Sequence, residues 1–403
     1  RLEEIDRTID NPHNYLYYLA TPPLLYGVIP RHLKAEGLNR DGDGFRRIVV
    51  EKPFGYDLSS ALELNRIYLD AFREEQIYRI DHFLGKETVQ NILALRFANS
   101  VFEPLWNRNY IDYVEITAVE NMGIGTRGGF YDGVGTLRDM VQNHLAQLLA
   151  VTAMEPPAAF DASGFRNEVV KVYQSLTPLT GEDIRHSVVR GQYMASEGRK
   201  GYREEEQVPT LSRTETYLAM RLELNNWRWG GVPFYIRTGK QMPTKVSEIV
   251  IHFKPAPYSL FRCEGGTCPV PNRLVIRIQP NEGIVLRLGM KKPGEGFEVL
   301  PMDMDFSYAE LGRLPTEDAY ARLIEDCIAG DPTLFIRSDA VESGWRFFDP
   351  ILKYWQDAPE CPLYGYPAGS WGPLEADSLM ARHGASWTNP CKNLTNTHLY
   401  CEL

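Results

Sequence analysis

The sequence predicts an α/β fold at its start and an α+β fold with a mainly antiparallel sheet over most of its 403 residues. Near the start, short apolar runs that do not alternate stand before a helical pattern. From about residue 80 onward, segments that alternate between apolar and polar residues dominate, and turn residues separate several of them. The chain is also too long for one ordinary domain, so two are expected.

The α/β part is predicted from two apolar runs and one helix. The runs cover residues 15–20 and 47–52, and a stop containing proline ends each of them. Runs of this kind are typical of strands that are covered on both faces, as in a parallel sheet. Asp57 is the expected N-cap of a helix over residues 58–72. Strand and helix in alternation predict the second half of a doubly wound sheet.

The α+β part is predicted from segments of period two. Its expected strands are 112–120, 217–225, 232–238, 247–253, 273–279 and 283–289. Packed helices are expected near residues 86–98, 136–152 and 316–329. The last residues, 391–403, have neither periodicity nor an apolar face, and we expect a loose tail there.

Composition and charge exclude several classes of protein. Hydrophobic residues make up 43% of the chain and charged residues 24%, which is ordinary for a globular protein. The net charge of −10 argues against nonspecific nucleic-acid binding. No apolar run approaches the roughly 20 residues of a membrane span, and no secretory signal precedes the first motif. We therefore expect a cytoplasmic protein without a nucleic-acid or membrane partner.

Cysteine content argues against a disulfide scaffold, because six cysteines are spread over 403 residues. Cys263 and Cys268 enclose four residues, so a cross-linked hairpin tip, a metal site and a pair of reduced thiols all stay open for them. No second pair of ligands follows at metal-binding spacing, and we expect no metal.

One G-x-G-x-x-G pattern occurs, at Gly123, Gly125 and Gly128. In a dinucleotide site a helix opens on such glycines, so that its N-terminus faces the pyrophosphate. Here more glycines intervene before any helical pattern starts, and the preceding strand alternates. We interpret the motif as a loop beside a pocket and not as a coenzyme site.

His144 lies on an apolar stripe of the predicted helix 136–152. A histidine in such a place is usually buried with one hydrogen bond, and the pattern favours that interpretation. Beside a carboxylate, the same imidazole could act as a general base near neutral pH. The pattern alone leaves both interpretations open.

Two further segments concentrate polar chemistry. Asp81, His82 and Lys86 stand just before a predicted helix, where they are either a charged helix start or a site for an anion. Lys240 and Lys245, with Arg237 before them, follow an apolar strand and are either a solvated turn or a cationic clamp for a phosphate.

Six segments, taken in this order, resemble those of glucose-6-phosphate dehydrogenases. They are Glu51–Gly55, Arg79–Glu87, Asn91–Phe97, Gly128–Asp132, Arg138–His144 and Arg237–Lys245. The resemblance runs from about residue 15 to about residue 390, and the second of these motifs is highly specific.

The resemblance implies an enzyme that moves a hydride from C1 of glucose 6-phosphate to NADP and forms 6-phosphoglucono-lactone, the first step of the oxidative pentose phosphate pathway. His144 is then the general base for the C1 hydroxyl proton, Asp81 pairs with its imidazole, and Lys52 lies between substrate and coenzyme. The other implied contacts are His82, Lys86 and Lys245 at the sugar phosphate, Glu120, Asp139 and Lys240 at the sugar hydroxyls, and Ala20, Thr21 and Pro22 beside the nicotinamide.

The resemblance also implies a division of the chain. Residues 1–78 are then the C-terminal half of a Rossmann-like NADP-binding domain, 79–390 a substrate-binding and dimerisation domain, and 391–403 a tail. The family's large sheet forms a dimer interface, so a homodimer is expected, and further pairing to a tetramer stays open. Two other functions stay open: a dehydrogenase of the same fold that uses another hexose phosphate or NAD, and a noncatalytic sugar-phosphate binder.

The chain begins with Arg1, and a first strand, a Gly-rich phosphate turn and the basic residues that favour NADP do not precede its first motif. We interpret this start as a truncation. Because the pyrophosphate would then lack its site, we expect little or no dehydrogenase activity from these 403 residues by themselves.

Phe83 stands where the family usually has tyrosine, so a hydroxyl that would donate to the phosphate is absent. One charge-assisted hydrogen bond is worth about 1–2 kcal/mol, and we expect substrate binding to be weaker by that amount. Phe83→Tyr should therefore lower the Michaelis constant for the sugar phosphate. An unchanged constant in steady-state assays would refute this expectation.

Overall fold

This computed structural model describes residues 5, 8, 13–258, 260–263, 271–294, 296–308 and 318–390. The chain divides into two compact units. The first comprises Arg1–Lys86, Met154–Gln174 and Thr316–Asp349, and the second Glu87–Ala153, Ser175–Pro315 and Pro350–Leu403. Among the described residues, no helix has the length and apolar character needed to cross a bilayer. The predicted tail, residues 391–403, lies outside the described residues. So do Cys268 and the side chain of Cys263.

The first unit is built on a three-stranded parallel sheet. Its strands are β1 (Tyr15–Leu19), β2 (Arg46–Glu51) and β3 (Ile77–Ile80), in that order, so β2 is central. Both strands predicted for this part are confirmed, and so is the α/β class. The side chains of Ile48, Val49 and Val50 are buried, because the middle strand is covered on both faces.

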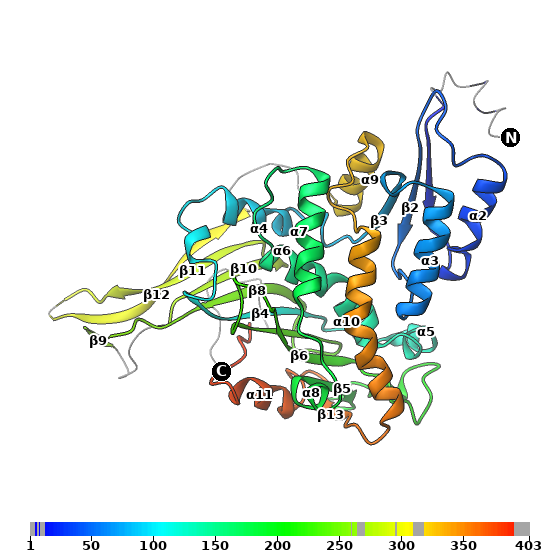
Figure 1. Ribbon diagram of the computed structural model, residues 1–403. Coiled ribbons are helices and arrows are strands. Elements are labelled where there is room, and N and C mark those ends of the chain that lie inside the picture. The colour runs from blue at the N-terminus through cyan, green and yellow to red at the C-terminus, as the bar shows by residue number, and fades with distance from the viewer. Residues whose placement is uncertain are drawn as a thin grey trace. The chain divides into compact units, whose positions relative to one another are not determined.

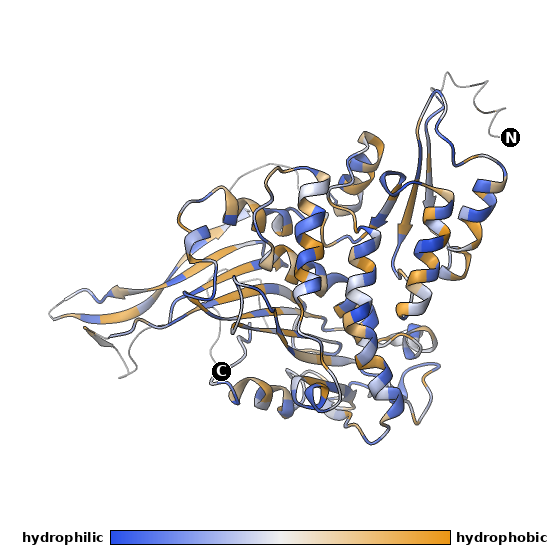
Figure 2. Cartoon of the chain, viewed as in Figure 1, coloured by the Kyte–Doolittle hydropathy of each residue, from blue (hydrophilic) through white to orange (hydrophobic). Residues whose placement is uncertain are grey.

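Helices alternate with these strands. They are η1 (Pro23–Leu25), α2 (Val28–Ala35), α3 (Leu58–Ala71), η2 (Glu74–Gln76) and α9 (Ala319–Ala329), and α7 (Ala162–Ser175) and α10 (Ser338–Asp357) also begin in this unit. The expected N-cap of α3 is confirmed, since the Asp57 carboxylate accepts a hydrogen bond of 2.7 Å from the Ser60 amide. Figure 2 shows hydrophilic and hydrophobic residues side by side on α2 and α3, as expected for surface helices.

Side-chain bonds fasten the later segment of this unit to its sheet. Arg47 donates to the carbonyl oxygens of Cys327 and Ile328 at 2.6 and 2.7 Å, which holds the end of α9. The Trp345 indole donates to the Phe54 carbonyl at 3.0 Å, just after β2. The unit is therefore assembled from segments far apart in the sequence.

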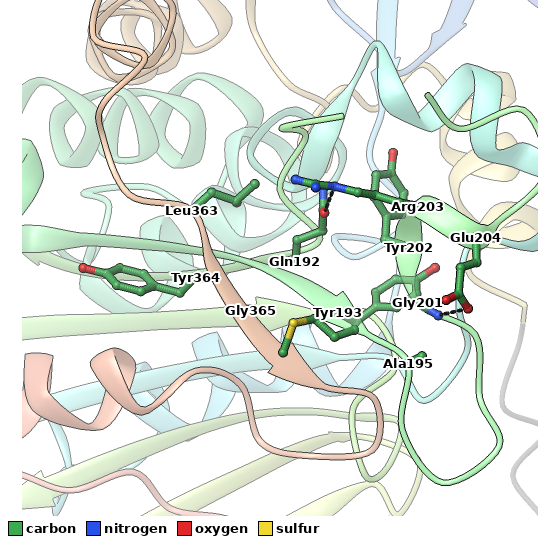
Figure 3. A pocket seen from close by; sticks show the side chains of 11 residues that line it. Gln192, Tyr193, Ala195, Gly201, Tyr202, Arg203, Glu204, Leu363, Tyr364 and Gly365 are labelled. Carbon is green, nitrogen blue, oxygen red and sulfur yellow. Dashed lines mark hydrogen bonds between the residues drawn. The ribbon is translucent and has the colours of Figure 1, made fainter. Parts of the chain in front are cut away.

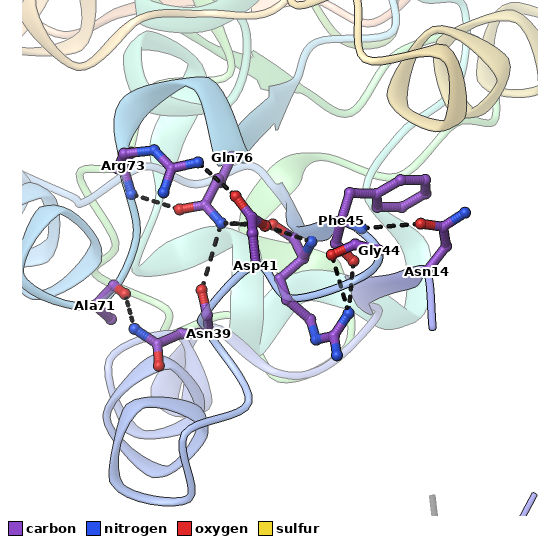
Figure 4. Close-up of polar contacts among 9 residues, drawn as sticks. Asn14, Asn39, Asp41, Gly44, Phe45, Ala71, Arg73 and Gln76 are labelled. Atoms are coloured by element: carbon purple, nitrogen blue, oxygen red, sulfur yellow. Dashed lines mark hydrogen bonds and ion pairs between the residues drawn. The ribbon is translucent and has the colours of Figure 1, made fainter. Parts of the chain in front are cut away.

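A polar network closes the amino edge of the sheet (Figure 4). The Gln76 amide donates to Asp41, to the Asn39 carbonyl and to the Arg46 carbonyl at 3.0, 3.3 and 2.9 Å. Arg73 pairs with the same Asp41 carboxylate at 2.5 Å. These bonds hold the starts of β2 and β3 together, and the opposite, carboxyl edge of the sheet is the one that carries the predicted site residues.

The second unit is built on a ten-stranded sheet (Figure 1). Its strands, in spatial order, are β13 (Tyr364–Pro367), β5 (Val188–Met194), β6 (Tyr217–Glu223), β7 (Pro233–Gly239), β4 (Ile111–Val119), β8 (Val246–Phe253), β10 (Arg273–Gln279), β11 (Gly283–Lys291), β12 (Glu298–Ser307) and β9 (Arg262–Cys263). All six strands predicted for this part are confirmed. The expectation of a mainly antiparallel sheet is confirmed too, but β4 and β7 pair in parallel, as do the short edge strands with their neighbours.

Short helices surround this sheet. They are α4 (Glu87–Phe97), η3 (Glu103–Leu105), η4 (Gly125–Arg127), α5 (Gly128–Asp132), η5 (Leu137–Leu145), α6 (Ala146–Ala153), α8 (Glu182–Ser187), η6 (Tyr202–Glu204) and α11 (Leu374–Ala381). The predicted helices near 86–98 and 136–152 are present here, and the one near 316–329 is α9, which belongs to the first unit. The interpretation of the G-x-G-x-x-G motif as a loop is wrong in part, because α5 begins at Gly128. This helix has only five residues and follows a strand of the ten-stranded sheet, not of the parallel one.

A buried polar cluster joins the C-terminal residues to the middle of this sheet. Glu115 on β4 accepts hydrogen bonds of 2.8 Å from the amide and the hydroxyl of Thr388, and lies 2.6 Å from the His252 ring nitrogen. Arg237, which the sequence places beside Lys240 and Lys245, belongs here instead. Its guanidinium bonds to Asn389 and to the Thr388 carbonyl, so this arginine fastens the C-terminal segment and is not a member of a phosphate clamp.

The Glu115 cluster predicts a pH-dependent stability. Burial alone would raise the pKa of Glu115, but the hydrogen bonds from His252 and Thr388 hold it below its ordinary value of 4.5. A carboxylate with a lowered pKa stabilises the fold above its unfolded pKa, and this contribution is lost as the pH falls through the folded pKa. Glu115→Gln should therefore lower the free energy of unfolding at pH 7 by about 1–3 kcal/mol.

The gap between Glu115→Gln and the wild type should shrink as the pH falls below 4.5. Urea denaturation between pH 7 and pH 3 measures it, with the exposed Glu206→Gln as control. A gap that does not change with pH would contradict the assignment.

Candidate active site

The carboxyl edge of the three-stranded sheet gathers several of the residues predicted from the sequence. Lys52 follows β2, Asp81 follows β3, and the segment 20–22 follows β1. Because the three strands are parallel and adjacent, these strand ends lie on one edge. Ligands of open α/β sheets bind outside that edge.

The turn after β3 orients three predicted residues. The Asp81 carboxylate is 3% exposed and accepts a hydrogen bond of 3.0 Å from the Phe83 amide. The Lys86 amide donates to the Phe83 carbonyl at 3.2 Å, which closes a second turn. Asp81, His82 and Lys86 therefore leave the sheet on a tight, hydrogen-bonded backbone.

Aromatic rings hold the imidazole and ammonium of this turn. The ring of His82 stacks on Tyr320 with centroids 5.9 Å apart and meets the edge of Phe83 at 5.0 Å. The Lys86 ammonium lies 4.7 Å from the centre of the Phe83 ring. Phe83 thus presents its ring face to Lys86, a cation–π contact worth about 0.5–1 kcal/mol or more that does not depend on a hydroxyl.

Three tyrosines that the sequence reasoning missed surround Glu51, the last residue of β2. The Tyr18 hydroxyl donates to the Glu51 carboxylate. Burial, followed by the nearby Glu51 charge, raises the pKa of Tyr26 to about 12 and also raises the pKa of Tyr18 and Tyr320. Phenols with such pKa values stay neutral and act as donors at physiological pH. Tyr18 lies near the end of β1, but Tyr26 follows η1 and Tyr320 lies in α9, so no shared sequence signal marked the three.

An unsatisfied buried hydroxyl at this edge of the sheet is consistent with a bound coenzyme. The Thr21 hydroxyl oxygen is buried and has no hydrogen-bond partner within the described part of the chain. A buried hydroxyl without a partner is costly, and a bound group would satisfy it. The site for nicotinamide that is predicted at Ala20, Thr21 and Pro22 is consistent with this atom.

In the second unit, the parallel register of β4 and β7 brings Glu120 and Lys240 together. Val119 lies opposite Gly239, and the Glu120 amide donates to the Gly239 carbonyl at 3.0 Å. Glu120 and Lys240 each follow the end of a strand, so their side chains meet at the same edge, where the Lys240 ammonium donates to the Glu120 carboxylate. This contact was not derivable from the strand patterns.

Asp139 completes the group from the helix η5. Its carboxylate lies 3.2 Å from the Lys240 ammonium. The centre of the Tyr131 ring lies 5.6 Å from the same ammonium. Lys240 is 4% exposed, whereas the side chains of Glu120 and Asp139 are 34% and 23% exposed. A buried ammonium therefore holds two carboxylates that still reach solvent, so the structure brings together all three residues predicted for sugar hydroxyls.

The helix that carries Asp139 and His144 departs from the prediction in geometry. Residues 137–145 form a π-helix, and α-helical geometry follows it from Ala146. In an α-helix with 3.6 residues per turn, two residues five apart point about 140° away from each other. In a π-helix the hydrogen bonds run from i to i+5, so Asp139 and His144 lie on nearly the same side. A π-helical turn at a functional site is a recurrent feature.

His144 is 2% exposed and lies within this π-helix. Asp81 belongs to the first unit and His144 to the second, so their pairing stays a prediction. Lys245 is exposed in the second unit, six residues after the end of β7. Its convergence with His82 and Lys86 stays a prediction for the same reason.

A cavity of about 310 Å³ lies elsewhere in the second unit (Figure 3). It is formed between the end of β5, the helix η6 and the start of β13, and Gln192, Arg203 and Tyr364 are among its lining residues. The residues predicted from the sequence do not line it. We therefore locate the candidate active site at the strand ends and not in this cavity.

A parallel sheet of the coenzyme-binding type, joined in one chain to a large mixed sheet with a lysine–carboxylate site, defines a two-unit dehydrogenase. Residues 1–91 match the family model described as "Glucose-6-phosphate dehydrogenase, NAD binding domain", and residues 93–388 match "Glucose-6-phosphate dehydrogenase, C-terminal domain". The chain belongs to the glucose-6-phosphate dehydrogenase family. Its class is oxidoreductase, and its activity is that of this family.

Individual relatives agree with this assignment. A glucose-6-phosphate 1-dehydrogenase from Aggregatibacter actinomycetemcomitans is 54% identical over 394 residues, which cover 97% of this chain and 78% of the relative. That from Treponema pallidum is 49% identical, over 99% of this chain and 78% of its own length.

Solved structures are similar over nearly the whole chain. A glucose-6-phosphate dehydrogenase in complex with its substrate glucose-6-phosphate aligns with a TM-score of 0.88 at 36% identity, covering 96% of this chain and 79% of that one. A glucose-6-phosphate 1-dehydrogenase from Mycobacterium avium aligns with a TM-score of 0.81 at 38% identity, covering 96% and 80%.

Proposed function

We propose that the chain, in a form that also carries a site for the coenzyme pyrophosphate, oxidises the C1 hydroxyl of glucose 6-phosphate to 6-phosphoglucono-lactone, with NADP as the hydride acceptor. The observation that carries this proposal is the Lys240 ammonium, buried between two partly exposed carboxylates. A sugar ring offers several hydroxyls, each of which can donate to a carboxylate and accept from an ammonium. The Lys240 group presents both kinds of partner in one place.

Lys240 also fixes its neighbours before substrate arrives. Its charge holds the Glu120 and Asp139 carboxylates at one place, and both side chains stay partly exposed to solvent. A carboxylate has about four acceptor positions, so the bond to Lys240 leaves others for sugar hydroxyls. Preorganised acceptors reduce the entropy that binding must overcome.

The sugar phosphate carries a charge near −2 and needs several cationic donors at once. In this proposal His82, Lys86 and Lys245 supply them. Two of the three are already oriented in the first unit, His82 by Tyr320 and Lys86 by Phe83. Lys245 has the exposure that a phosphate ligand needs.

The chemical step needs one proton transfer by the protein. His144 takes the C1 hydroxyl proton, so that the oxygen lone pair stabilises the positive character that builds at C1 as the hydride leaves. Asp81 holds the imidazole tautomer and stabilises the imidazolium that forms. No metal ligand set is required for this chemistry.

The coenzyme supplies the hydride acceptor when it is bound. Ala20, Thr21 and Pro22 would line its nicotinamide side, and Lys52 would contact both coenzyme and substrate. Pro53 follows Lys52 directly and disfavours the α region for it, so the backbone after β2 limits where the ammonium can point. The choice of NADP rests on the family resemblance, and turnover with NAD at an equal or higher kcat/KM would contradict it.

The Lys240 group predicts the outcome of a binding experiment. Lys240→Met leaves Glu120 and Asp139 facing each other without a cation, so the affinity for glucose 6-phosphate should fall at least about tenfold, or about 1.4 kcal/mol. Isothermal titration calorimetry of the whole chain measures this directly, without requiring turnover.

The matched control is Lys254→Met, because the Lys254 ammonium of the same unit donates to a backbone carbonyl, that of Arg108, at 2.6 Å. It should bind glucose 6-phosphate like the wild type. Equal affinities for Lys240→Met and Lys254→Met would refute the proposed sugar site. A protein that binds the sugar phosphate but never oxidises it, even when the chain is extended to the length of its relatives, would instead favour a noncatalytic binder.

We also propose that the chain forms a homodimer through β11 and β12. Along β12 the side chains alternate: Asp303 and Asp305 pair with Arg287 and Arg277, while Met302, Met304 and Phe306 are 50%, 65% and 38% exposed. Figure 1 shows this hairpin extending beyond the other strands of its sheet. An apolar row of this kind on an extended hairpin fits a second copy of the same surface.

Met304→Glu places a charge in the apolar row and should shift the protein from dimer to monomer. Size-exclusion chromatography with light scattering measures the mass. Leu211→Glu is the control, because Leu211 is 84% exposed outside this hairpin and should leave the mass unchanged. A dimer that survives Met304→Glu would argue against this interface.

A further inference from the structure

Glu215 contacts the start of η5 through both its backbone and its side chain. The Glu215 carbonyl accepts hydrogen bonds from the amide and the hydroxyl of Thr136 at 3.1 and 2.9 Å. Its carboxylate accepts a third bond of 3.1 Å from the Leu137 amide. One residue therefore satisfies successive donors at the N-terminus of the helix that carries Asp139 and His144.

The next residue contacts the strand end that carries Lys240. The Thr216 carbonyl accepts a hydrogen bond of 2.9 Å from the Lys240 amide. The hydroxyl of Tyr366 donates to the Lys240 carbonyl at 2.7 Å and also bonds to the Thr216 hydroxyl. Two neighbouring residues, Glu215 and Thr216, thus fix the backbones of η5 and of Lys240 relative to each other.

Gly135 gives the Glu215 carboxylate the space that it occupies. Gly135 has a φ of +73°, and a Cβ at this position would lie 2.5 Å from a carboxylate oxygen of Glu215. A larger residue would have to displace either the carboxylate or the turn that leads into η5. The sequence pattern Gly135–Thr136–Leu137 therefore matches one fixed position of the Glu215 side chain.

The position of Glu215 requires a hydrogen-bond acceptor for the Leu137 amide and does not require a negative charge. Glu215 is 6% exposed, and burial raises the pKa of its carboxyl, although the Leu137 amide and the charges of Arg190 and Arg138 act in the opposite direction. A neutral acceptor of the same shape would make the same bond to Leu137 without placing a charge in the interior.

We propose that Glu215 is a positioning residue for the sugar site: through its hydrogen bonds to Thr136 and Leu137 it holds η5 where Asp139 reaches Lys240. This inference rests on the proposed function, because it gives the Lys240 group the role of binding glucose 6-phosphate. Glu215 itself lies behind the group and acts on substrate only through η5.

Glu215→Ala removes the bond to Leu137 and should weaken glucose 6-phosphate binding at least about tenfold, because a shift of about 1 Å in a positioned group costs on that order or more. Glu215→Gln keeps an acceptor at the same place and should restore wild-type affinity. Calorimetry measures both. Hydrogen exchange of the Leu137 amide, measured without substrate, should be faster in Glu215→Ala only.

Glu115→Ala is the matched control, since Glu115 is also a buried glutamate of the same unit but contacts Thr388 and His252. It should lower stability and leave the affinity for glucose 6-phosphate unchanged. If Glu115→Ala weakens binding as much as Glu215→Ala, general destabilisation explains the result and the positioning role is refuted.

A pair of glycine variants tests the same contact without touching Glu215. Gly135→Ala and Gly125→Ala both place alanine at positive φ, but Gly125 has no atom within 4 Å of the added Cβ. Only Gly135→Ala should weaken substrate binding. In the double variant Gly135→Ala with Glu215→Ala the clash is absent, so the two effects should be less than additive.

The outcomes separate this inference from the proposed function. A wild type that does not bind glucose 6-phosphate refutes the proposed function, whatever the Leu137 amide does. A wild type that binds it, together with a Glu215→Ala variant of equal affinity, refutes the positioning role alone. Failure of Glu215→Gln to restore affinity would also overturn it, because the charge and not the hydrogen bond would then matter.

Discussion

The second unit depends on one interaction, the bond between the buried Lys240 ammonium and the Glu120 and Asp139 carboxylates. A buried ammonium without partners is very costly, so these three groups must stay together for the interior to be stable. The parallel register of β4 and β7 aligns two of them, and the π-helix η5 supplies the third. The same constraint that stabilises the site leaves carboxylate oxygens at its surface.

The first unit solves a related problem with a different device. A polar network around Asp41 and Gln76 connects the strands at the amino edge of its parallel sheet. The predicted site residues lie at the opposite, carboxyl edge. Aromatic faces orient the cations there, as Phe83 does for Lys86. Phe83 keeps the ring face that a tyrosine would also present and lacks only the hydroxyl, so this residue removes one donor without disturbing the contact to Lys86.

Predictions from the sequence succeeded where a local pattern reports a local structure. The six predicted strands of the second unit and the main helices follow periods of two and 3.6 residues, β1 and β2 follow apolar runs, and Asp57 follows a capping preference, all of which neighbouring residues determine. Strands β3, β5, β9, β12 and β13 were not predicted. The helix over 136–152 was found by the same rule, but its π-helical first half was not, because i to i+5 bonding depends on what packs against the helix. Arg237 was misjudged for a similar reason: its partners Thr388 and Asn389 lie about 150 residues away.

By itself the sequence determined the two fold classes, the family and the residue types available for binding a phosphorylated sugar, since these are properties of motifs and their order. Only the tertiary structure decided that Lys240, Glu120 and Asp139 touch, and that Glu215 stands behind them. The physical reason is that strand register and buried hydrogen bonds join segments through space, and no periodicity along the chain encodes which distant donor meets which acceptor.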